Sequence, residues 1–226
     1  MHPDTAPPSG TTFRERVRAL PTFGPGLPAL DPKDTPSTPH ELFVRWFDQA
    51  VDAGVQAPHA MTLATADAAG RVHARTVVLK DVSADGWWFA GHATSGKGRD
   101  LAENPHAALT FLWRELGRQV RVTGPAVPAD PEKSAADFLA QPDHSRAAGL
   151  VNRQGEPLGS REDYTAAFAN ALDTVRAEPG TVSPTWTSYS LAPTEVEFWQ
   201  SSDTTGQTRL LYRTDGNDWT KGLLWP

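Results

Sequence analysis

The segment GHATSGKG, residues 91–98, contains the clearest chemical pattern in the sequence. It matches G-x-x-x-x-G-K, and it lies between a run of apolar residues typical of a strand and a predicted helix. Backbone N–H groups at a helix N-terminus, together with the Lys97 ammonium, can bind a phosphate. A nucleotide-triphosphatase loop needs Ser or Thr after the lysine to hold magnesium, and Gly98 stands there. The segment therefore predicts either a phosphate site without magnesium or an ordinary glycine-rich turn.

A second segment, ARTVVLKD at residues 74–81, carries two cations on a stretch with the composition of a strand. Side chains alternate between the two faces of a strand, so Arg75 and Lys80 are expected to point in opposite directions. Val77 and Leu79 share the face of Arg75. Such a strand either binds one polar group at each end, with a flat ligand along the backbone between them, or is an ordinary strand with two solvated ends.

Other kinds of chemistry have no support in the sequence. The seven histidines lack metal-binding spacings such as H-E-x-x-H, and there is no G-x-S-x-G nucleophile elbow. The absence of cysteine excludes disulfides and thiolate ligands, and it fits a reducing compartment. A net charge of −6 disfavours a general nucleic-acid scaffold. No apolar run approaches the roughly 20 residues of a membrane span, and no apolar secretion signal is present. We therefore expect a cytoplasmic protein with no metal site that binds neither nucleic acid nor membrane.

The elements that must position these residues are mainly short strands. The sequence predicts strands at 60–65, 72–82, 87–91, 107–113, 118–127, 185–191, 194–200, 209–213 and 219–225. The turn signals between them favour an antiparallel sheet or barrel over repeated βαβ units. Helices are predicted at 13–20, 38–54, 95–104, 130–140 and 160–175. The fold class is therefore α+β, mainly β. We expect one domain over residues 38–226, preceded by a proline-rich arm over residues 1–37 that is mobile or lies across a neighbouring surface.

The segment EFWQSSDTTGQTRLLYR, residues 197–213, contains two predicted strands separated by eight polar residues, 201–208. A tight hairpin needs only two to five residues between its strands. The length of the polar run therefore predicts a longer loop, which would lie at the mouth of a binding site if its flanking aromatic residues contact a ligand.

Five segments in the same order resemble the FMN-dependent pyridoxine/pyridoxamine 5′-phosphate oxidases. They are ARTVVLKD, GHATSGKGRDLAENP, LGRQVRVTGPA, VEFWQ and the C-terminal Trp-Pro. The resemblance extends over about residues 40–226. It implies an FMN-binding split β-barrel with peripheral helices, and a homodimer with FMN at the subunit interface. The stretch HA-x-S-x-KGR-x-LA-x-NP is more similar to the phenazine-biosynthesis oxidases of secondary metabolism.

The resemblance also implies which residues contact FMN. Arg75 and Lys97 resemble the two cations that bind its phosphate, and Gln154 resembles a contact from the other subunit. Arg209 resembles an arginine beside the flavin ring, where it would favour the anionic reduced form. The complete implied set is Arg75, Val77, Val78, Leu79, Lys80, Ala90, Gly91, Ser95, Gly96, Lys97, Gln119, Gln154, Gly155, Trp199 and Arg209. The chain departs from the family at three places. It has Ala90-Gly91 where the family has a Tyr-Thr pair, Gly96 where the family has Arg, and Gly155 where the family has Ser.

The implied substrate positions match the family less well. They are Lys80, Ser145, Thr205 and Gln207, of which the last two replace the family's Arg and His beside the substrate ring. The family also uses Tyr and Arg for the substrate phosphate, where this chain has Asp137 and Gln141. A carboxylate repels phosphate, and glutamine lacks the bidentate cation of arginine. We therefore expect a substrate without a phosphate group.

Together these features indicate an FMN-dependent oxidase or dehydrogenase of a small, non-phosphorylated substrate, with reduced polycyclic secondary metabolites as a candidate class. A hydride would pass to flavin N5, and molecular oxygen would reoxidise the flavin. No protein acid or base is assigned. The alternatives are a pyridoxine/pyridoxamine 5′-phosphate oxidase that makes pyridoxal 5′-phosphate, a non-catalytic flavin-binding or flavin-reductase protein, and a deazaflavin-using relative.

Overall fold

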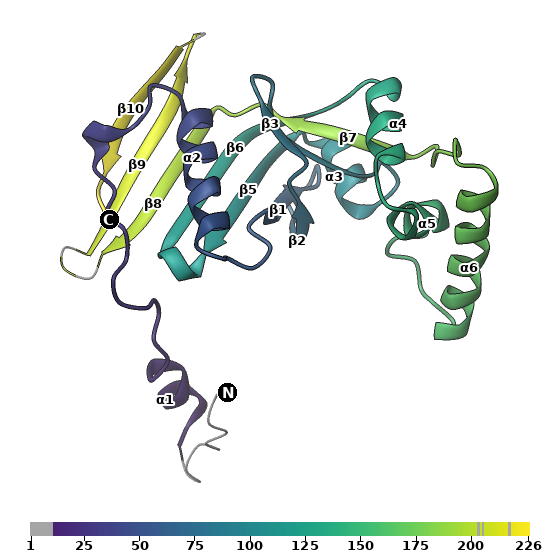
Figure 1. Ribbon diagram of the computed structural model, residues 1–226, viewed down its shortest axis with the longest axis horizontal. Coiled ribbons are helices and arrows are strands. Elements are labelled where there is room, and N and C mark those ends of the chain that lie inside the picture. Colours follow the sequence, from purple (N-terminus) through teal and green to yellow (C-terminus); the bar gives the residue numbers. More distant parts are fainter. Residues whose placement is uncertain (1–10, 203, 205, 217) are drawn as a thin grey trace.

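A computed structural model describes residues 11–202, 204, 206–216 and 218–226, and its strands join into one antiparallel sheet flanked by helices (Figure 1). The strands are β1 (Ala60–Ala66), β2 (Val72–Val78), β3 (Asp81–Ser83), β4 (Gly86–His92), β5 (His106–Trp113), β6 (Arg118–Pro128), β7 (Trp186–Leu191), β8 (Glu195–Ser202), β9 (Gly206–Asp215) and β10 (Asp218–Leu224). The helices are α1 (Phe13–Arg18), α2 (Pro39–Asp52), α3 (Gly96–Glu103), α4 (Pro131–Leu139), α5 (Asp143–Val151) and α6 (Arg161–Ala177). The predicted α+β, mainly β class is confirmed.

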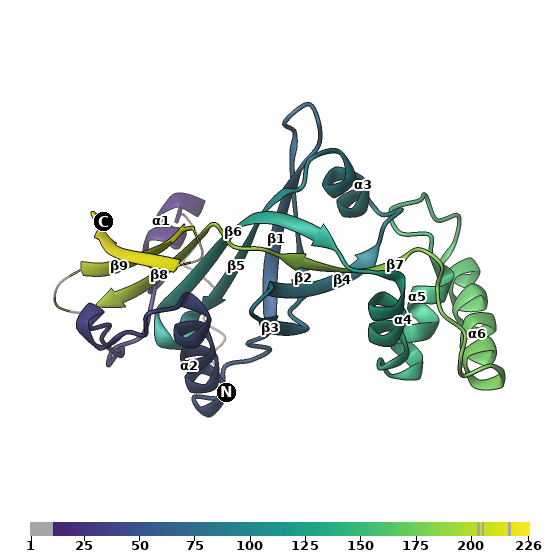
Figure 2. The same ribbon diagram turned by 90° about the horizontal axis from the view of Figure 1, so that it is seen from above.

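β6 is the strand at which the sheet divides. Its residues Arg118–Thr123 pair with β8, whereas Ala126–Pro128 pair with β7. From β8 the sheet continues to β9 and β10, and on its other side β6 pairs with β5, followed by β1 and β2. β7 pairs with β4, which also pairs with β3. Figure 2 shows β1 and β2 crossing the direction of β4 and β7, so the sheet curls back on itself.

α2 supplies much of the hydrophobic core. Thr38 caps the helix, because its hydroxyl accepts a hydrogen bond from the Glu41 N–H at 3.4 Å. Phe43 and Trp46 are buried, and the Trp46 ring meets that of Phe198 edge-on with centroids 5.2 Å apart. Complete burial of an apolar side chain such as Phe stabilises the fold by about 1.5–3 kcal/mol. The helix therefore fixes β8 from the core side of the sheet.

α4, α5 and α6 lie together at the end of the molecule remote from β8, β9 and β10 (Figures 1 and 2). α5 packs against α6, and α4 packs on β7. The sequence does not predict α5, because it begins after Pro142 without a side-chain cap and includes Gly149. None of the helices in the described ranges is long and apolar enough to span a membrane.

The predicted strand over 72–82 requires correction, since it is interrupted after Val78. The Leu79 N–H donates to the His59 carbonyl at 2.9 Å, and the Lys80 N–H donates to the Trp88 carbonyl at 2.8 Å. The chain therefore changes its hydrogen-bonding partner between these two residues and continues as β3 beside β4. Composition alone does not show this change of partner.

The predicted long loop over 201–208 is also wrong. β8 extends to Ser202 and β9 begins at Gly206, and these two residues lie opposite each other in the ladder. A β-ladder is made by backbone groups, so polar side chains are compatible with it where the hairpin end extends beyond the core. The hairpin is therefore tighter than its composition indicates.

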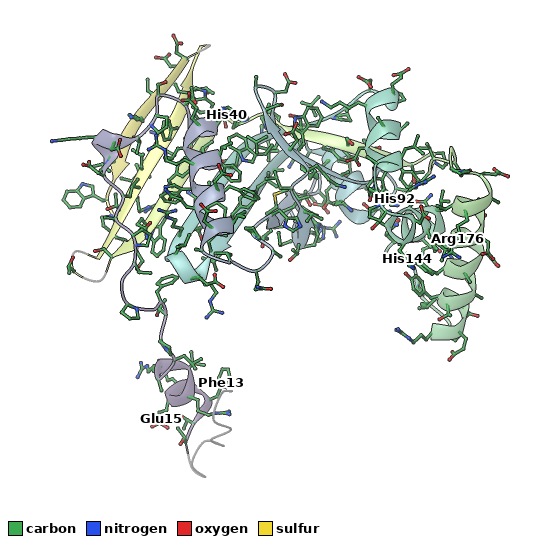
Figure 3. All side chains as sticks on the ribbon, in the orientation of Figure 1. Phe13, Glu15, His40, His92, His144 and Arg176 are labelled. Atoms are coloured by element: carbon green, nitrogen blue, oxygen red, sulfur yellow. The ribbon has the colours of Figure 1, made fainter. Side chains whose placement is uncertain are left out.

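The inner part of the N-terminal arm is attached to the sheet. The Lys221 ammonium donates to the Thr35 carbonyl at 2.6 Å, and Leu30 packs against the hydrophobic core. α1, in contrast, projects away from the body of the chain in the view of Figure 1. Figure 3 shows Phe13 on this helix, where 73% of the residue is exposed.

Candidate functional site

The N-terminus of α3 and the Lys97 side chain form a cradle for an anion at the end of β4. Ser95 caps α3: its hydroxyl accepts from the Gly98 N–H at 3.4 Å and donates to the His92 carbonyl at 2.7 Å. The Lys97 ammonium donates to the Ser95 hydroxyl at 3.2 Å. Gly91 makes room for this lysine, because a Cβ at that position would lie 2.3 Å from Lys97 Cε. The strand, turn and helix expected around the glycine-rich segment are all present.

Arg75 reaches the same region from β2. Its Nη1 donates to the Leu63 carbonyl at 3.1 Å and to the Thr65 hydroxyl at 2.8 Å. Its Nη2 lies 3.7 Å from Asp100 Oδ2 on α3. Asp100 accepts a hydrogen bond from Thr65 at 2.5 Å and lies 3.0 Å from His73 Nδ1. One network therefore ties β1, β2 and α3 together and holds the guanidinium near the start of the helix.

The electrostatics of this cradle favour an anion. Burial lowers the pKa of Lys97, and the positive charge of Arg75 lowers it further. Burial also lowers the pKa of Arg75, although the negative charge of Asp100 opposes this shift. The carboxylate beside Arg75, that of Asp100, is already engaged by Thr65 and His73. A phosphate would supply the missing negative charge through charge-assisted hydrogen bonds at a helix N-terminus.

His92 is the last residue of β4, before the turn that leads into α3, and Figure 3 shows it near the helical end of the molecule. Its Nδ1 is 2.8 Å from the Thr185 hydroxyl, which donates to Asn152 Oδ1 at 2.7 Å. Because the Thr185 proton points to Asn152, His92 Nδ1 must carry the proton of a neutral ring. Burial, followed by the charge of Lys97, lowers the pKa of His92 to about 4. The ring is therefore neutral at pH 7. Sequence reasoning used His92 only as part of a family motif.

The residues predicted to flank a flavin ring form one row across the sheet. Gln119 on β6 lies opposite Trp199 on β8, and Trp199 lies opposite Arg209 on β9. Directly paired residues point to the same face of a sheet. The neighbouring residues on the same strands, Val120, Phe198 and Leu210, are buried in the core. The row therefore occupies the face opposite to the core.

Two further residues meet this row at Trp199. Its indole N–H donates to the Gln207 side-chain oxygen. The Phe23 ring of the N-terminal arm lies 5.6 Å from the Trp199 ring, tilted by 46°. Sequence reasoning placed Gln207 beside a substrate but did not identify Phe23, because the arm contains no motif that indicates its contact.

The phosphate cradle and the row of Trp199 lie on opposite faces of the sheet within one chain. Arg75 is opposite Leu63, which is fully buried in the core. Arg75 therefore emerges on the core side, near α3, whereas the row emerges on the other side. The structure does not bring the two predicted halves of the cofactor site together within a single subunit.

The segment predicted to run along the flavin lies at an edge of the sheet, because β2 ends the strand order. Val77 and Leu79 pack against the core, whereas Val78 is 43% exposed. The alternation predicted for this segment is confirmed up to Val78. The exposed edge leaves this part of the backbone accessible to a planar ligand.

Lys80 forms an ion pair with Asp137, which stands where the family resemblance implies a tyrosine. Its ammonium lies 3.6 Å from Asp137 Oδ1 on α4. Asp137 Oδ2 accepts a hydrogen bond from the Trp186 indole at 2.9 Å. Gln141, one turn later, donates to the Asp137 carbonyl at 3.5 Å. The cation expected to bind a substrate phosphate is thus already paired with a carboxylate.

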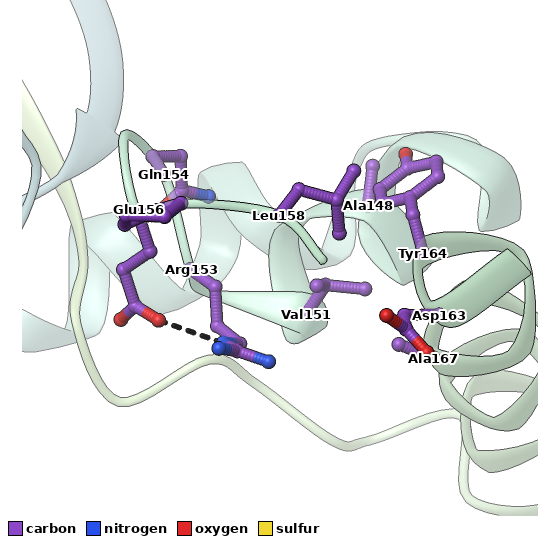
Figure 4. Close-up of a pocket in the computed structure, with 10 residues that line it drawn as sticks. Ala148, Val151, Arg153, Gln154, Glu156, Leu158, Asp163, Tyr164 and Ala167 are labelled. Atoms are coloured by element: carbon purple, nitrogen blue, oxygen red, sulfur yellow. Dashed lines mark hydrogen bonds and ion pairs between the residues drawn. The ribbon is translucent and has the colours of Figure 1, made fainter. Parts of the chain in front are cut away.

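The other predicted residues lie apart from these groups. Ser145 is exposed on α5, and Thr205 lies outside the described residues. Gln154 and Gly155 are in the loop between α5 and α6. Figure 4 shows Gln154 at a pocket of about 380 Å³ lined largely by apolar side chains such as that of Leu158. Their predicted role as contacts from a second subunit is not tested by a single chain.

Comparison with known sequences identifies relatives over most of the chain. Residues 47–200 match the family described as pyridoxamine 5′-phosphate oxidase, and residues 186–226 match the pyridoxine 5′-phosphate oxidase C-terminal dimerisation region. A pyridoxine/pyridoxamine 5′-phosphate oxidase of Paraburkholderia phymatum is 41% identical over 201 residues, which cover 88% of this chain and 94% of that protein. The corresponding protein of Rubrobacter xylanophilus is 39% identical over 188 residues, covering 83% and 87%.

Solved structures show the same architecture. PhzG from Burkholderia lata 383, in complex with tetrahydrophenazine-1-carboxylic acid, has a TM-score of 0.81 at 34% identity, covering 88% of this chain and 99% of that one. A pyridoxamine 5′-phosphate oxidase-related, FMN-binding protein from Nostoc punctiforme has a TM-score of 0.68 at 20% identity, covering 84% and 98%. The split β-barrel with peripheral helices is thereby confirmed.

Proposed function

Because the chain belongs to the pyridoxamine 5′-phosphate oxidase family and is an FMN-dependent oxidase, we propose that it oxidises a small, partly reduced, planar substrate that carries no phosphate. The observation that carries this proposal is the ion pair between Lys80 and Asp137, 3.6 Å apart. This pair occupies the position at which the family resemblance places the substrate phosphate.

The cradle at α3 fits the phosphate of FMN. Arg75 and Lys97 would supply two cations, Ser95 a hydroxyl, and the first turn of α3 its free N–H groups. Bound FMN supplies two-electron chemistry, accepting a hydride at N5 and then reducing molecular oxygen to hydrogen peroxide. The residues of the chain bind and orient the reactants and exclude water from them.

We further propose a homodimer in which each FMN is shared between subunits. The placement of Arg75 and Trp199 on opposite faces of the sheet supports this arrangement, because one chain alone does not surround a single ligand with both residues. The match of residues 186–226 to a dimerisation region supports it as well. In this arrangement one subunit contributes the phosphate cradle, and its partner contributes the row of Gln119, Trp199 and Arg209.

Asp137 makes the expected substrate position around Lys80 unsuitable for a phosphate ester. Its carboxylate offsets part of the Lys80 charge and would repel a substrate dianion. Gln141 cannot provide the bidentate cation that the family resemblance implies at that position. Each lost charge-assisted contact costs on the order of 1.5–3 kcal/mol, so two of them weaken phosphate binding by roughly a hundredfold or more.

The chemical class of the proposed substrate rests on the similarity to PhzG. That protein was solved with tetrahydrophenazine-1-carboxylic acid, which is a partly reduced tricycle with a carboxylate and no phosphate. A planar substrate of this kind would stack between the flavin and aromatic side chains. Lys80 would remain available to a substrate carboxylate of single charge, since Asp137 offsets only part of its field.

The second candidate function is oxidation of pyridoxine or pyridoxamine 5′-phosphate. It is favoured by the relatives of that name, which reach 41% identity over 88% of the chain. Under this alternative, Lys80 would exchange Asp137 for the substrate phosphate, and another cation would compensate for Gln141.

The double variant Asp137→Tyr/Gln141→Arg distinguishes these candidates. If the proposal is right, the variant gains kcat/KM for pyridoxine 5′-phosphate by roughly a hundredfold, because it regains two phosphate contacts. Asp137→Asn is the matched control, since it removes the charge without adding a phenol, and we expect it to gain less. Efficient turnover of pyridoxine 5′-phosphate by the unaltered enzyme, with no gain in the variant, would support the second candidate. The release of hydrogen peroxide measures the turnover of pyridoxine 5′-phosphate by the unaltered enzyme and by the variants.

A further inference from the structure

Glu197 is a buried carboxylate held between two arginines on the face of the sheet that carries Trp199. Its Oε1 accepts from Arg209 Nε at 2.6 Å, and its Oε2 accepts from Arg121 Nη2. Only 4% of the Glu197 side chain is exposed, compared with 27% for Arg209 and 45% for Arg121. Both oxygens of this carboxylate are therefore committed to guanidinium groups.

The strand register explains this arrangement. Glu197 lies directly opposite Arg121 on β6, whereas Arg209 on β9 lies opposite Trp199, two residues further along β8. Arg209 is thus the diagonal neighbour of Glu197 on the same face, a separation that long side chains can bridge. The Arg209 Nη1 also donates to the Trp225 carbonyl at 3.1 Å. The guanidinium is held on both sides and has little rotational freedom.

The hydrogen bond and the negative charge of Glu197 raise the pKa of Arg209 above its already high value. The arginine therefore remains charged, but its charge is partly offset at hydrogen-bond distance by the carboxylate. Arg121 in turn offsets part of the carboxylate charge. The net charge at this position depends on all three residues and not on Arg209 alone.

We propose that Glu197 is a positioning residue for Arg209 and that, together with Arg121, it sets the positive charge that the flavin ring experiences. This inference rests on the proposed placement of Arg209 beside the ring. Positive charge near the ring stabilises the reduced flavin, which carries more negative charge than the oxidised form. Without the Glu197 carboxylate, the full charge of Arg209 would make the flavin easier to reduce. Without Arg121, the Glu197 carboxylate would offset more of the Arg209 charge and make the flavin harder to reduce.

Two substitutions should therefore change the flavin in opposite directions. Glu197→Gln removes the carboxylate charge, keeps the size of the side chain, and should favour the reduced flavin. Arg121→Gln removes the cation that shares Glu197 and should favour the oxidised flavin. If Glu197 and Arg121 had a purely structural role, their substitutions would not shift the ratio of reduced to oxidised flavin in opposite directions.

The experiment measures the ratio of reduced to oxidised FMN in the holoenzyme against a reference dye at fixed potential. We expect a change of about tenfold in each variant, upward for Glu197→Gln and downward for Arg121→Gln, which corresponds to ~30 mV for a two-electron couple. Glu195→Gln is the matched control. Glu195 forms a similar pair with Arg213, with Nε and Oε1 2.7 Å apart, on the same two strands but without contact to Arg209. We expect the ratio of reduced to oxidised FMN in this control to stay within about twofold of the wild type, because the charge of Glu195 lies further from the proposed position of the ring.

Shifts of the same sign in both variants, or a Glu197→Gln shift no larger than that of Glu195→Gln, would overturn the inference. If Glu197→Gln does not fold, the downward shift of Arg121→Gln remains a required result. A wild-type enzyme that oxidises none of the proposed substrates would contradict the proposed function, but it would leave these potentials and their signs measurable.

Discussion

The basic residues around the candidate site fall into two groups with different partners. Arg75 and Lys97 converge on one helix N-terminus, and the nearby carboxylate of Asp100 is already engaged by other donors. Lys80, by contrast, is paired with Asp137. Two cations near a single carboxylate keep a net positive charge and attract phosphate, whereas a cation matched by its own carboxylate does so weakly. At the scale of single residues, this difference supports the proposal that the chain binds a cofactor phosphate but not a substrate phosphate.

His92 provides a prediction about pH at the same scale. Its pKa is about 4 in the folded protein, because burial and the charge of Lys97 disfavour the imidazolium, and near 6.5 in an unfolded chain. Between these values the unfolded state binds a proton that the folded state does not. Stability is therefore lost as pH falls from about 6.5 towards 4. By pH 5 this single group accounts for on the order of 2 kcal/mol.

The variant His92→Asn tests this assignment, because its amide can still donate to Thr185 but does not titrate. The free energy of unfolding, measured in urea at pH 7 and pH 5, should fall less for the variant than for the wild type. His144→Asn, which changes an exposed histidine on α5, is the control and should keep the wild-type difference. Equal losses in His92→Asn and the wild type would contradict the neutral, buried ring.

At the scale of elements, β6 determines how the sheet is divided between its two branches. Gly124 lies where β8 separates from β7, and a Cβ there would be 2.0 Å from the Ala192 carbonyl oxygen. This neighbour is backbone and cannot move without displacing the start of β8. The branch point therefore requires glycine for close approach of two chains.

The substitution Gly124→Ala should destabilise the protein by about 2 kcal/mol or more, through overpacking against backbone. Gly222→Ala makes the same change on β10, where no atom lies within 4 Å of the added Cβ, and should be close to neutral. Thermal unfolding of both variants beside the wild type measures the difference. Similar melting temperatures for the two variants would show that the branch point tolerates a side chain.

Individual elements were predictable where the chain contains local signals. The helix starts predicted at Thr38, Ser95 and Ser160 are confirmed, and each of these residues caps its helix in the structure. α5 was missed because no side chain caps its start. The break between β2 and β3 and the short hairpin after β8 were missed as well, because hydrogen-bonding partners and strand ends beyond the core are set by distant segments.

At the scale of the whole molecule, the two predicted halves of the cofactor site lie on opposite faces of the sheet, which supports the proposed sharing of the site between two subunits. The strand, turn and helix around Lys97 were predictable from sequence, because a glycine-rich turn, a helix start and a lysine are consecutive in the chain. The row of Gln119, Trp199 and Arg209 depends on the pairing of three strands, and the contacts of Phe23, Glu197 and Asp137 depend on tertiary packing. Family resemblance identified the row, whereas the partners of these residues required the structure.

A shared site predicts complementation between two inactive variants. Arg75→Gln and Arg209→Gln should each abolish tight FMN binding as homodimers, since each variant damages both sites. In a mixed dimer, one site receives both substitutions and the other receives neither. Differently tagged and co-purified mixed dimers should therefore bind about half the FMN of the wild type, as a two-fold arrangement requires. Mixed dimers that bind no more FMN than either homodimer would show that both residues act within one chain.

The proposed activity is the oxidation of a reduced, planar, non-phosphorylated substrate. Its most direct test is anaerobic rapid mixing of the FMN-loaded enzyme with tetrahydrophenazine-1-carboxylic acid or with pyridoxine 5′-phosphate, following the loss of oxidised flavin absorbance. We predict a second-order rate constant for flavin reduction that is roughly a hundredfold greater with the tricycle, from the two phosphate contacts that the pocket lacks. Reduction by pyridoxine 5′-phosphate at an equal or greater rate would contradict the account.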